Sequence, residues 1–192
     1  RGWFFTLHAI ATMVFDSVAF KNVISSGLVL DAKGNKMSRH VGNVTDPFEM
    51  IHKYGADPVR FYMMTNSEPW DNLKFDQNGV DECRRKFFGT LYNTYSFFAL
   101  YANVDGFDPD KASLSDSQDH FTEIDRWILS CLNTLIKGVA NELNNYDPTR
   151  AGRLIDAFVN DDLSNWYVRL NRKRFWGKEM SADKQAAYET LY

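Results

Sequence analysis

The chain has 192 residues, of which 44% are hydrophobic and 15% aromatic, enough to bury one sizeable core or two modest ones, which excludes intrinsic disorder. No stretch approaches the roughly 18 unbroken apolar residues that span a bilayer, so we expect no membrane partner. The net charge of −3 argues against a protein that coats nucleic acid over its whole surface. Cys83 and Cys131 stand alone, so we expect neither a metal site nor a disulfide, and a reducing, cytoplasmic setting.

The N-terminal part of the chain mixes helix and strand signals. Residues 3–15 predict a buried helix, residues 20–24 a strand, and residues 28–30 a second strand before a turn at 31–35. This mixture is typical of the edge of an α/β domain. Because the chain starts at Arg1, without methionine and inside an apolar pattern, we interpret it as a fragment of a longer protein.

Two short helices are predicted next. Asp46 can cap the first one, and Pro47 follows where its missing N–H is harmless. Gly55 suits the left-handed residue that ends this helix, and Asp57-Pro58 starts the second. Turn-forming residues then fill positions 65–79, and the sequence beyond them is helical to its end. We therefore divide the chain into residues 1–72 and an all-α part, residues 73–192.

Apolar residues recur at helical spacing in three stretches of the second part, which predicts a helical bundle. A loop at 105–119 separates the first two stretches, and Asp147-Pro148 opens the third. The Asp161-Asp162 pair marks either a bend or a new helix start. The three apolar sets are Val80, Phe87, Leu91, Thr94 and Phe98; Ile124, Ile128, Leu132, Leu135, Val139 and Leu143; and Leu154, Ile155, Phe158, Leu163 and Trp166.

One loop carries residues with chemical potential. Lys36, Met37, Ser38, Arg39 and His40, called here the signature loop, follow the second predicted strand and precede the helix capped at Asp46. Two cations and a hydroxyl on such a loop can close on a polyphosphate and neutralise charge that builds on its leaving group. The alternative for this pentapeptide alone is a solvated surface loop.

The order and spacing of several short motifs resemble the class I aminoacyl-tRNA synthetases. These motifs are RGWF at 1–4, GLVLD at 27–31, KMS at 36–38, GN at 42–43, DP at 46–47, and GAD at 55–57 with Arg60. The resemblance implies that residues 1–72 are the C-terminal edge of a Rossmann-type α/β catalytic domain. It also implies that the parent protein activates an amino acid with ATP and Mg²⁺.

In that family a Lys-Met-Ser-Lys-Ser loop binds ATP. The resemblance therefore makes Lys36, Met37, Ser38, Arg39 and His40 the ATP-binding residues, with Lys36 and Arg39 as the catalytic cations. Arg39 replaces a lysine by a planar guanidinium, and His40 replaces a serine. We expect Met37 to pack into the domain, whereas Ser38 either binds phosphate or caps the turn. The family's His-Ile-Gly-His and Gly-x-Asp-Gln elements are absent, so the fragment alone should not activate an amino acid.

Residues 163–176, LSNWYVRLNRKRFW, resemble the isoleucyl branch of this family more than the valyl or leucyl branches. The resemblance implies that residues 73–192 form an all-α domain that binds the anticodon arm of isoleucine tRNA, the parent using ATP and isoleucine. The candidate contacts are Trp166, Arg169, Arg172, Lys173 and Arg174, because cations can follow phosphates and tryptophan can stack on an unpaired base.

Alternatives remain for both assignments. Trp166 and Phe175 can instead be core residues. The cations between Arg169 and Lys178 can face solvent or pair with Asp161 and Asp162. A second cluster, Arg84, Arg85 and Lys86, is a further candidate for contact with the tRNA stem. A valyl or leucyl fragment, or a helical RNA-binding module without a catalytic parent, stays open.

Overall fold

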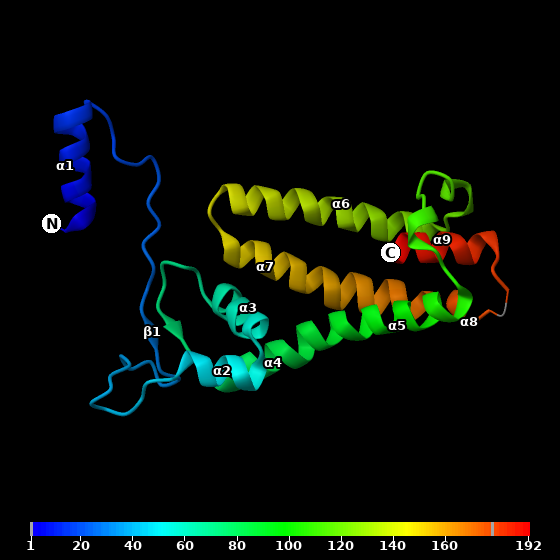
Figure 1. The fold of residues 1–192 in the computed structure, drawn as a ribbon, viewed down its shortest axis with the longest axis horizontal. Helices are drawn as coiled ribbons and strands as arrows, with labels where there is room; N and C mark the ends of the chain where they lie inside the picture. The colour runs from blue at the N-terminus through cyan, green and yellow to red at the C-terminus, as the bar shows by residue number, and fades with distance from the viewer. Residues whose placement is uncertain (1, 178) are drawn as a thin grey trace.

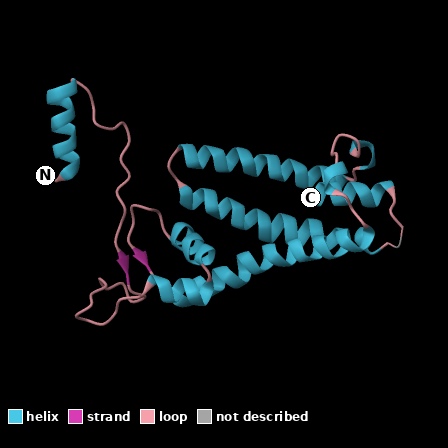
Figure 2. Cartoon of the chain, in the orientation of Figure 1, coloured by secondary structure: helices cyan, strands magenta, loops and turns pink. Residues whose placement is uncertain are grey.

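The computed structural model describes residues 2–177 and 179–192, so what was expected of Arg1 and Lys178 lies outside the described residues. Helices dominate and two short strands accompany them (Figures 1 and 2), which confirms a mainly α fold. The elements are α1 (Trp3–Phe15), β1 (Val29–Leu30), α2 (Pro47–Tyr54), α3 (Ala56–Asn66), β2 (Leu73–Lys74), α4 (Gln77–Cys83), η1 (Arg84–Phe88), α5 (Gly89–Asp105), η2 (Pro109–Lys111), η3 (Gln118–His120), α6 (Glu123–Asn144), α7 (Pro148–Ala157), η4 (Phe158–Val168), α8 (Arg169–Trp176) and α9 (Ala182–Leu191).

The first helix stands apart from the rest of the described chain, at the end of an extended segment (Figure 1). The predicted helix at residues 3–15 is confirmed as α1, but its predicted burial is wrong, because none of its residues is buried. The strand predicted at 20–24 is also wrong. A strand needs a hydrogen-bonded neighbour, and among the described residues the one strand pair is β1 with β2, which run parallel.

A small core lies directly behind the signature loop. Asp46 Oδ1 accepts the Phe48 N–H at 2.7 Å and starts α2, while Gly55, with φ of 92°, allows the sharp corner into α3. The buried core residues are Met50, Val59, Tyr62, Leu73, Phe75 and Val80. Helices α2, α3 and α4 and strand β2 therefore form one packed unit next to the loop.

Long helical rods dominate the second part (Figure 1), together with the shorter α9, η2 and η3. The first rod joins α4, η1 and α5, the second is α6, and the third joins α7, η4 and α8. Both joined rods contain π-helical segments, η1 and η4. Asp161 and Asp162 lie inside η4, so they mark neither a bend into a loop nor a new helix start.

The first predicted apolar set is only partly confirmed. Phe87 and Thr94 are buried as predicted, whereas Leu91 between them is 40% exposed. Phe87 lies in the π segment η1, whose turns close their hydrogen bonds over five residues instead of four.

No described helix is both long enough and apolar enough to cross a membrane.

Candidate functional site

The turn that precedes the signature loop is built around one carboxylate. Asp31 Oδ1 accepts the N–H of Lys33 at 3.0 Å and the N–H of Asn35 at 2.7 Å. Gly34 lies in this turn with φ of 87°, a conformation that favours glycine. Leu30 pairs with Lys36 in an isolated antiparallel bridge, so the chain reverses between them and returns beside β1.

Asn43 ties the two ends of the loop together. Its Nδ2 donates to Asp31 Oδ2 at 3.0 Å and to the Lys36 carbonyl at 3.2 Å, while its Oδ1 accepts the Ser38 N–H at 2.8 Å. The hydrogen bond from the Asn43 side chain, followed by that from the Asn35 backbone N–H, holds the pKa of the Asp31 carboxyl below its usual value. Reasoning from the sequence assigned no role to Asp31 or Asn43 beyond their place in the family motifs.

The side chains of the loop divide between the core and the solvent. Met37 is half-buried and packs against the core around Met50 and Val59, where it also lines an apolar cavity of about 250 Å³, so its prediction as an anchor is confirmed. Lys36, Arg39 and His40 are exposed. Within the described residues, neither Lys36 nor Arg39 makes an ion pair.

Ser38 closes the outer turn of the loop through its backbone. Its carbonyl accepts the N–H of Val41 at 3.1 Å and of Gly42 at 3.0 Å. Gly42 has φ of 74°, which again suits glycine. The loop is therefore held by backbone and amide contacts, and it presents two cations from an anchored base. Such an arrangement can bind a polyphosphate without first breaking internal ion pairs.

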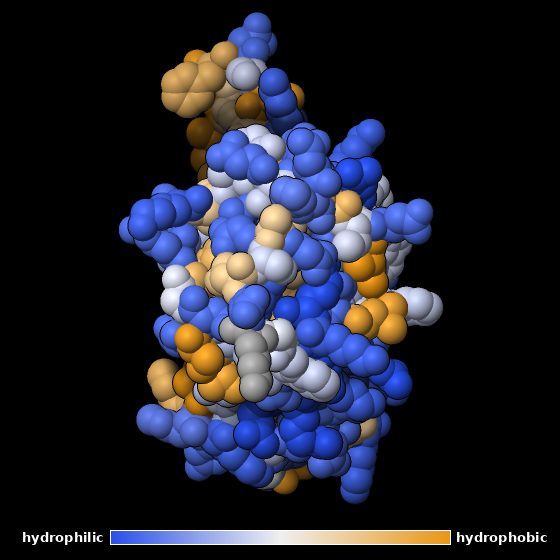
Figure 3. Space-filling model, turned by 90° about the vertical axis from the view of Figure 1, so that its right-hand side faces the viewer, coloured by the Kyte–Doolittle hydropathy of each residue, from blue (hydrophilic) through white to orange (hydrophobic). Residues whose placement is uncertain are grey.

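The third rod carries a second candidate surface, here called the basic–aromatic face: Trp166, Arg169, Arg172, Lys173 and Trp176. All five side chains are exposed, with Trp166 at 59%, and their spacings of three, four and seven bring them to one side of the helix. The alternative that Trp166 is a core residue is wrong, whereas Phe175 is buried at 1% exposure. Figure 3 shows the molecule from the side that lies at the right of Figure 1, and this side is largely hydrophilic, with separate apolar patches.

Arg174 differs from its neighbours because it points into the protein. Its Nη1 lies 2.7 Å and 2.9 Å from the two carboxylate oxygens of Asp125, and its side chain is 13% exposed. Its Nη2 also pairs with Asp183 at 2.9 Å. Tyr167 donates its hydroxyl to Asp125 at 2.8 Å. These contacts join α6, α8, η4 and α9, so Arg174 stabilises the bundle instead of extending the exposed face.

The pKa of the buried Asp125 carboxyl follows from its hydrogen-bond partners. Burial raises the pKa of Asp125, but the bonds from Arg174, Thr122 and Tyr167 together lower it below its usual value. Asp125 also completes the capping box of α6 with Thr122. The Thr-x-x-Asp spacing was the signal in the sequence that could have identified this helix start.

The second basic cluster is paired along its own helix. Arg84 and Arg85 contact Asp81 at 2.8 Å and 2.9 Å, and Lys86 pairs with Glu82. Such pairs at spacings of three and four are ordinary surface contacts. The charge of this cluster is thus largely neutralised locally, unlike that of the basic–aromatic face.

Comparison with known proteins relates both surfaces to one family. Residues 1–76 match the family model described as "tRNA synthetases class I (I, L, M and V)", and residues 125–192 match the "Anticodon-binding domain of tRNA ligase". The chain belongs to the class I aminoacyl-tRNA synthetases. Across all of its length this synthetase chain is 70% identical to an isoleucine–tRNA ligase of Bacteroides thetaiotaomicron and 65% identical to one of Porphyromonas gingivalis.

The synthetase chain spans 16% and 17% of the length of these two relatives. Its fold also matches a solved structure, LeuRS of Agrobacterium radiobacter K84 in ternary complex with tRNA and LeuAMS. That match has a TM-score of 0.65 at 19% identity and covers 98% of this chain and 23% of the LeuRS chain. The expected edge of a class I catalytic fold followed by helices is therefore confirmed.

Proposed function

We propose that the chain is the part of an isoleucine–tRNA ligase that supplies the ATP-phosphate loop and a tRNA-binding surface. The whole protein would activate isoleucine with ATP, transfer it to isoleucine tRNA, and act in the cytoplasm. The identity of 70% over the full chain to a ligase of that name carries the proposal. The anchored loop with two exposed cations agrees with it. The valyl and leucyl alternatives have no comparable support.

Lys36 and Arg39 would act on the phosphates of ATP. The isoleucine carboxylate attacks the α-phosphorus, the bond to the β-phosphate oxygen breaks, and pyrophosphate leaves with the charge. Two cations placed at that pyrophosphate lower the energy of the transition state. Arg39 offers two parallel N–H donors to phosphate oxygens. We propose that the whole protein binds ATP together with Mg²⁺.

The basic–aromatic face would bind the anticodon arm of the tRNA. Arg169, Arg172 and Lys173 can neutralise phosphates, and Trp166 or Trp176 can stack on a base that is unpaired in the loop. The division at residues 72 and 73 follows the same proposal. It is supported by the two family matches, one ending at residue 76 and the other starting at residue 125.

The test is isoleucine-dependent exchange of pyrophosphate into ATP by the full-length protein. Lys36→Met and Arg39→Met should each lower the exchange rate by about 10²–10³-fold, the effect of removing one preorganised donor to a developing charge. Lys33→Met is the matched control, because Lys33 is also exposed in the preceding turn. Wild-type exchange that prefers valine or leucine, or normal exchange by both variants, would contradict the proposal.

A further inference from the structure

The first turns of α7 dock against the end of α3, and the two helices lie side by side in Figure 1. The Thr149 hydroxyl lies 2.7 Å from the Met64 carbonyl and 3.0 Å from the Ser67 carbonyl. Arg153 donates from Nε to the Thr65 carbonyl at 2.9 Å and from Nη2 to the Asn66 carbonyl at 3.3 Å. Two side chains of α7 therefore bind four consecutive carbonyls of α3 and its cap.

These contacts satisfy groups that a helix cannot satisfy by itself. The last carbonyls of a helix lack partners within it, and a cation near them is favourable. Thr149 and Arg153 are four residues apart, so both side chains lie on the same side of α7. Thr149 is fully buried. We call this contact the joint.

The joint is tight because the two backbones approach closely beside it. A Cβ atom on Gly152 would lie 2.6 Å from Thr65 Cγ2, a separation that real Cβ atoms do not show. The turn before α7 is also constrained, since Tyr146 has φ of 61° and its hydroxyl accepts a hydrogen bond from Asn22 at 3.1 Å. Segments from three parts of the sequence thus meet at this place.

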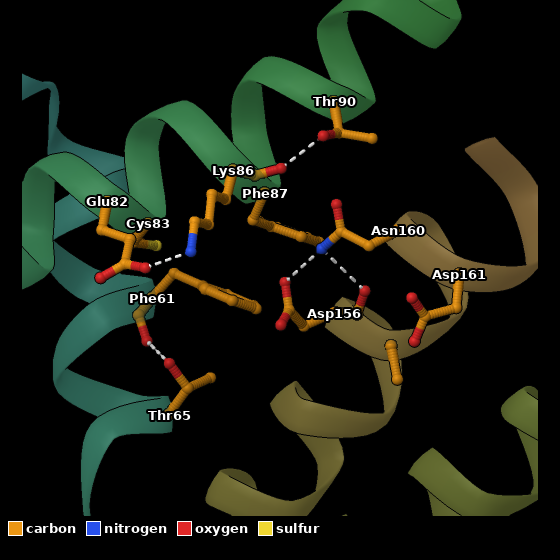
Figure 4. Close-up of a pocket in the computed structure, with 11 residues that line it drawn as sticks. Phe61, Thr65, Glu82, Cys83, Lys86, Phe87, Thr90, Asp156, Asn160 and Asp161 are labelled. Carbon is orange, nitrogen blue, oxygen red and sulfur yellow. Dashed lines mark hydrogen bonds and ion pairs between the residues drawn. The ribbon is translucent and has the colours of Figure 1, made fainter. Parts of the chain in front are cut away.

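Two open spaces flank the joint. A cleft of about 630 Å³ lies between α3, the first rod and the third rod (Figure 4), and its lining includes Thr65 of α3, Cys83 of α4 and Asp156 of α7. A second, apolar hollow of about 600 Å³ reaches to Val139 and Ile155. Because close packing is absent in these two spaces, the hydrogen bonds of Thr149 and Arg153 are the direct polar link between the start of α7 and the end of α3, while α7 also packs along α6.

The joint lies between the two candidate surfaces. Beyond it, α7, η4 and α8 continue as one helical rod to Trp176, on the order of 40 Å at the usual rise per residue. On its other side, α3 belongs to the core that holds Met37 of the signature loop. A tilt of about 5° at the joint would move the far end of the rod by about 3 Å, given that length.

We infer that Thr149 and Arg153 are positioning residues for tRNA charging. They set the direction of the rod that carries the basic–aromatic face, so that a tRNA bound there reaches the aminoacyl-adenylate beside the signature loop. This inference rests on the proposed function. Loss of the joint should affect the two half-reactions differently. Amino acid activation needs only the signature-loop side of the joint, whereas transfer to tRNA needs both sides.

The experiment compares Thr149→Val, Thr149→Ser and Arg153→Met in the full-length enzyme. Pyrophosphate exchange should stay within about twofold of wild type, since that step involves no tRNA. The kcat for charging at saturating tRNA should fall by about tenfold or more in Thr149→Val and Arg153→Met, because misplacement by an ångström is costly. Thr149→Ser keeps the hydroxyl and should restore charging.

Arg150→Met is the matched control, since Arg150 is exposed on the same helix and lies 3.9 Å from Glu142, away from the carbonyls of α3. Arg153 is exposed as well, so its variant should fold even if Thr149→Val does not. Charging that is unchanged in Arg153→Met, or that falls in parallel with exchange, would overturn the inference. A wild-type enzyme that fails to charge isoleucine tRNA would instead refute the proposed function.

Discussion

Asn43 donates a hydrogen bond to Asp31 across the signature loop, with 3.0 Å between Nδ2 and Oδ2. The same amide binds the backbone of Lys36 and Ser38, so one side chain connects the turn before the signature loop with the first and third residues of the loop. The loop can thus be ordered before ATP arrives, which lowers the entropic cost of placing Lys36 and Arg39.

Asn43→Ala should therefore weaken activation without unfolding the protein. We expect pyrophosphate exchange to fall by about 10–100-fold through looser placement of the cations, with a change in unfolding free energy of about 1 kcal/mol. Asn35→Ala is the control, because its side chain makes one longer bond to Asp31, at 3.3 Å. Equal activity in the two variants would show that the Asn43 amide does not order the loop.

Arg174→Met should destabilise the helical part. It leaves Asp125 buried without its cation, a change that costs about 3–5 kcal/mol in other proteins. Denaturant unfolding followed by circular dichroism measures this cost, and Arg172→Met, at an exposed position on the same helix, should change it little. Comparable stability of the two variants would mean that the Arg174–Asp125 pair adds nothing to the fold.

The same pair should make stability depend on pH. The pKa of Asp125 is lowered in the folded protein, so its contribution is present above the unfolded value of about 4 and is lost as pH falls through the folded pKa. In Arg174→Met the pKa of Asp125 should instead rise with burial, so the loss of stability should be largest at neutral pH and shrink in acid. Thermal unfolding between neutral and acidic pH tests this; a loss independent of pH would contradict it.

Trp166 should contribute to RNA binding and not to folding. Trp166→Ala should change the unfolding free energy by less than about 0.5 kcal/mol, as at other exposed sites, and weaken tRNA binding by about 1–3 kcal/mol through lost stacking. Trp127→Ala is the control, because Trp127 is also partly exposed but lies on α6 and is not part of the basic–aromatic face. A destabilised Trp166→Ala variant with normal tRNA affinity would restore the core interpretation.

Local signals in the sequence predicted much of the fold. Asp46, Gly55 and Asp147 mark helix ends through contacts with residues at most four positions away, so their neighbours determine their role. The place of Met37 followed from its apolar side chain beside charged residues. The strand at 20–24 and the burial of α1 were wrong, because both depend on partners that no described segment provides.

The remaining features depend on contacts far apart in the sequence. Arg174 and Asp125 are 49 positions apart, and Thr149 and Met64 are 85 apart. No helical period shows which arginine of residues 169–174 turns inward. The π segments were equally hidden, because a pattern with a period of 3.6 contains no sign of one inserted residue.

The most direct test of the central claim is a titration of this chain, residues 1–192, with isoleucine tRNA, valine tRNA and isoleucine tRNA with a changed anticodon, at several salt concentrations. We expect tightest binding to isoleucine tRNA and a clear loss when its anticodon changes. Lys173→Met should reduce the salt slope by about one. Equal binding to all three RNAs, with the same steep salt dependence, would contradict the proposed function, because the basic–aromatic face would then only attract phosphates and would not read the anticodon arm.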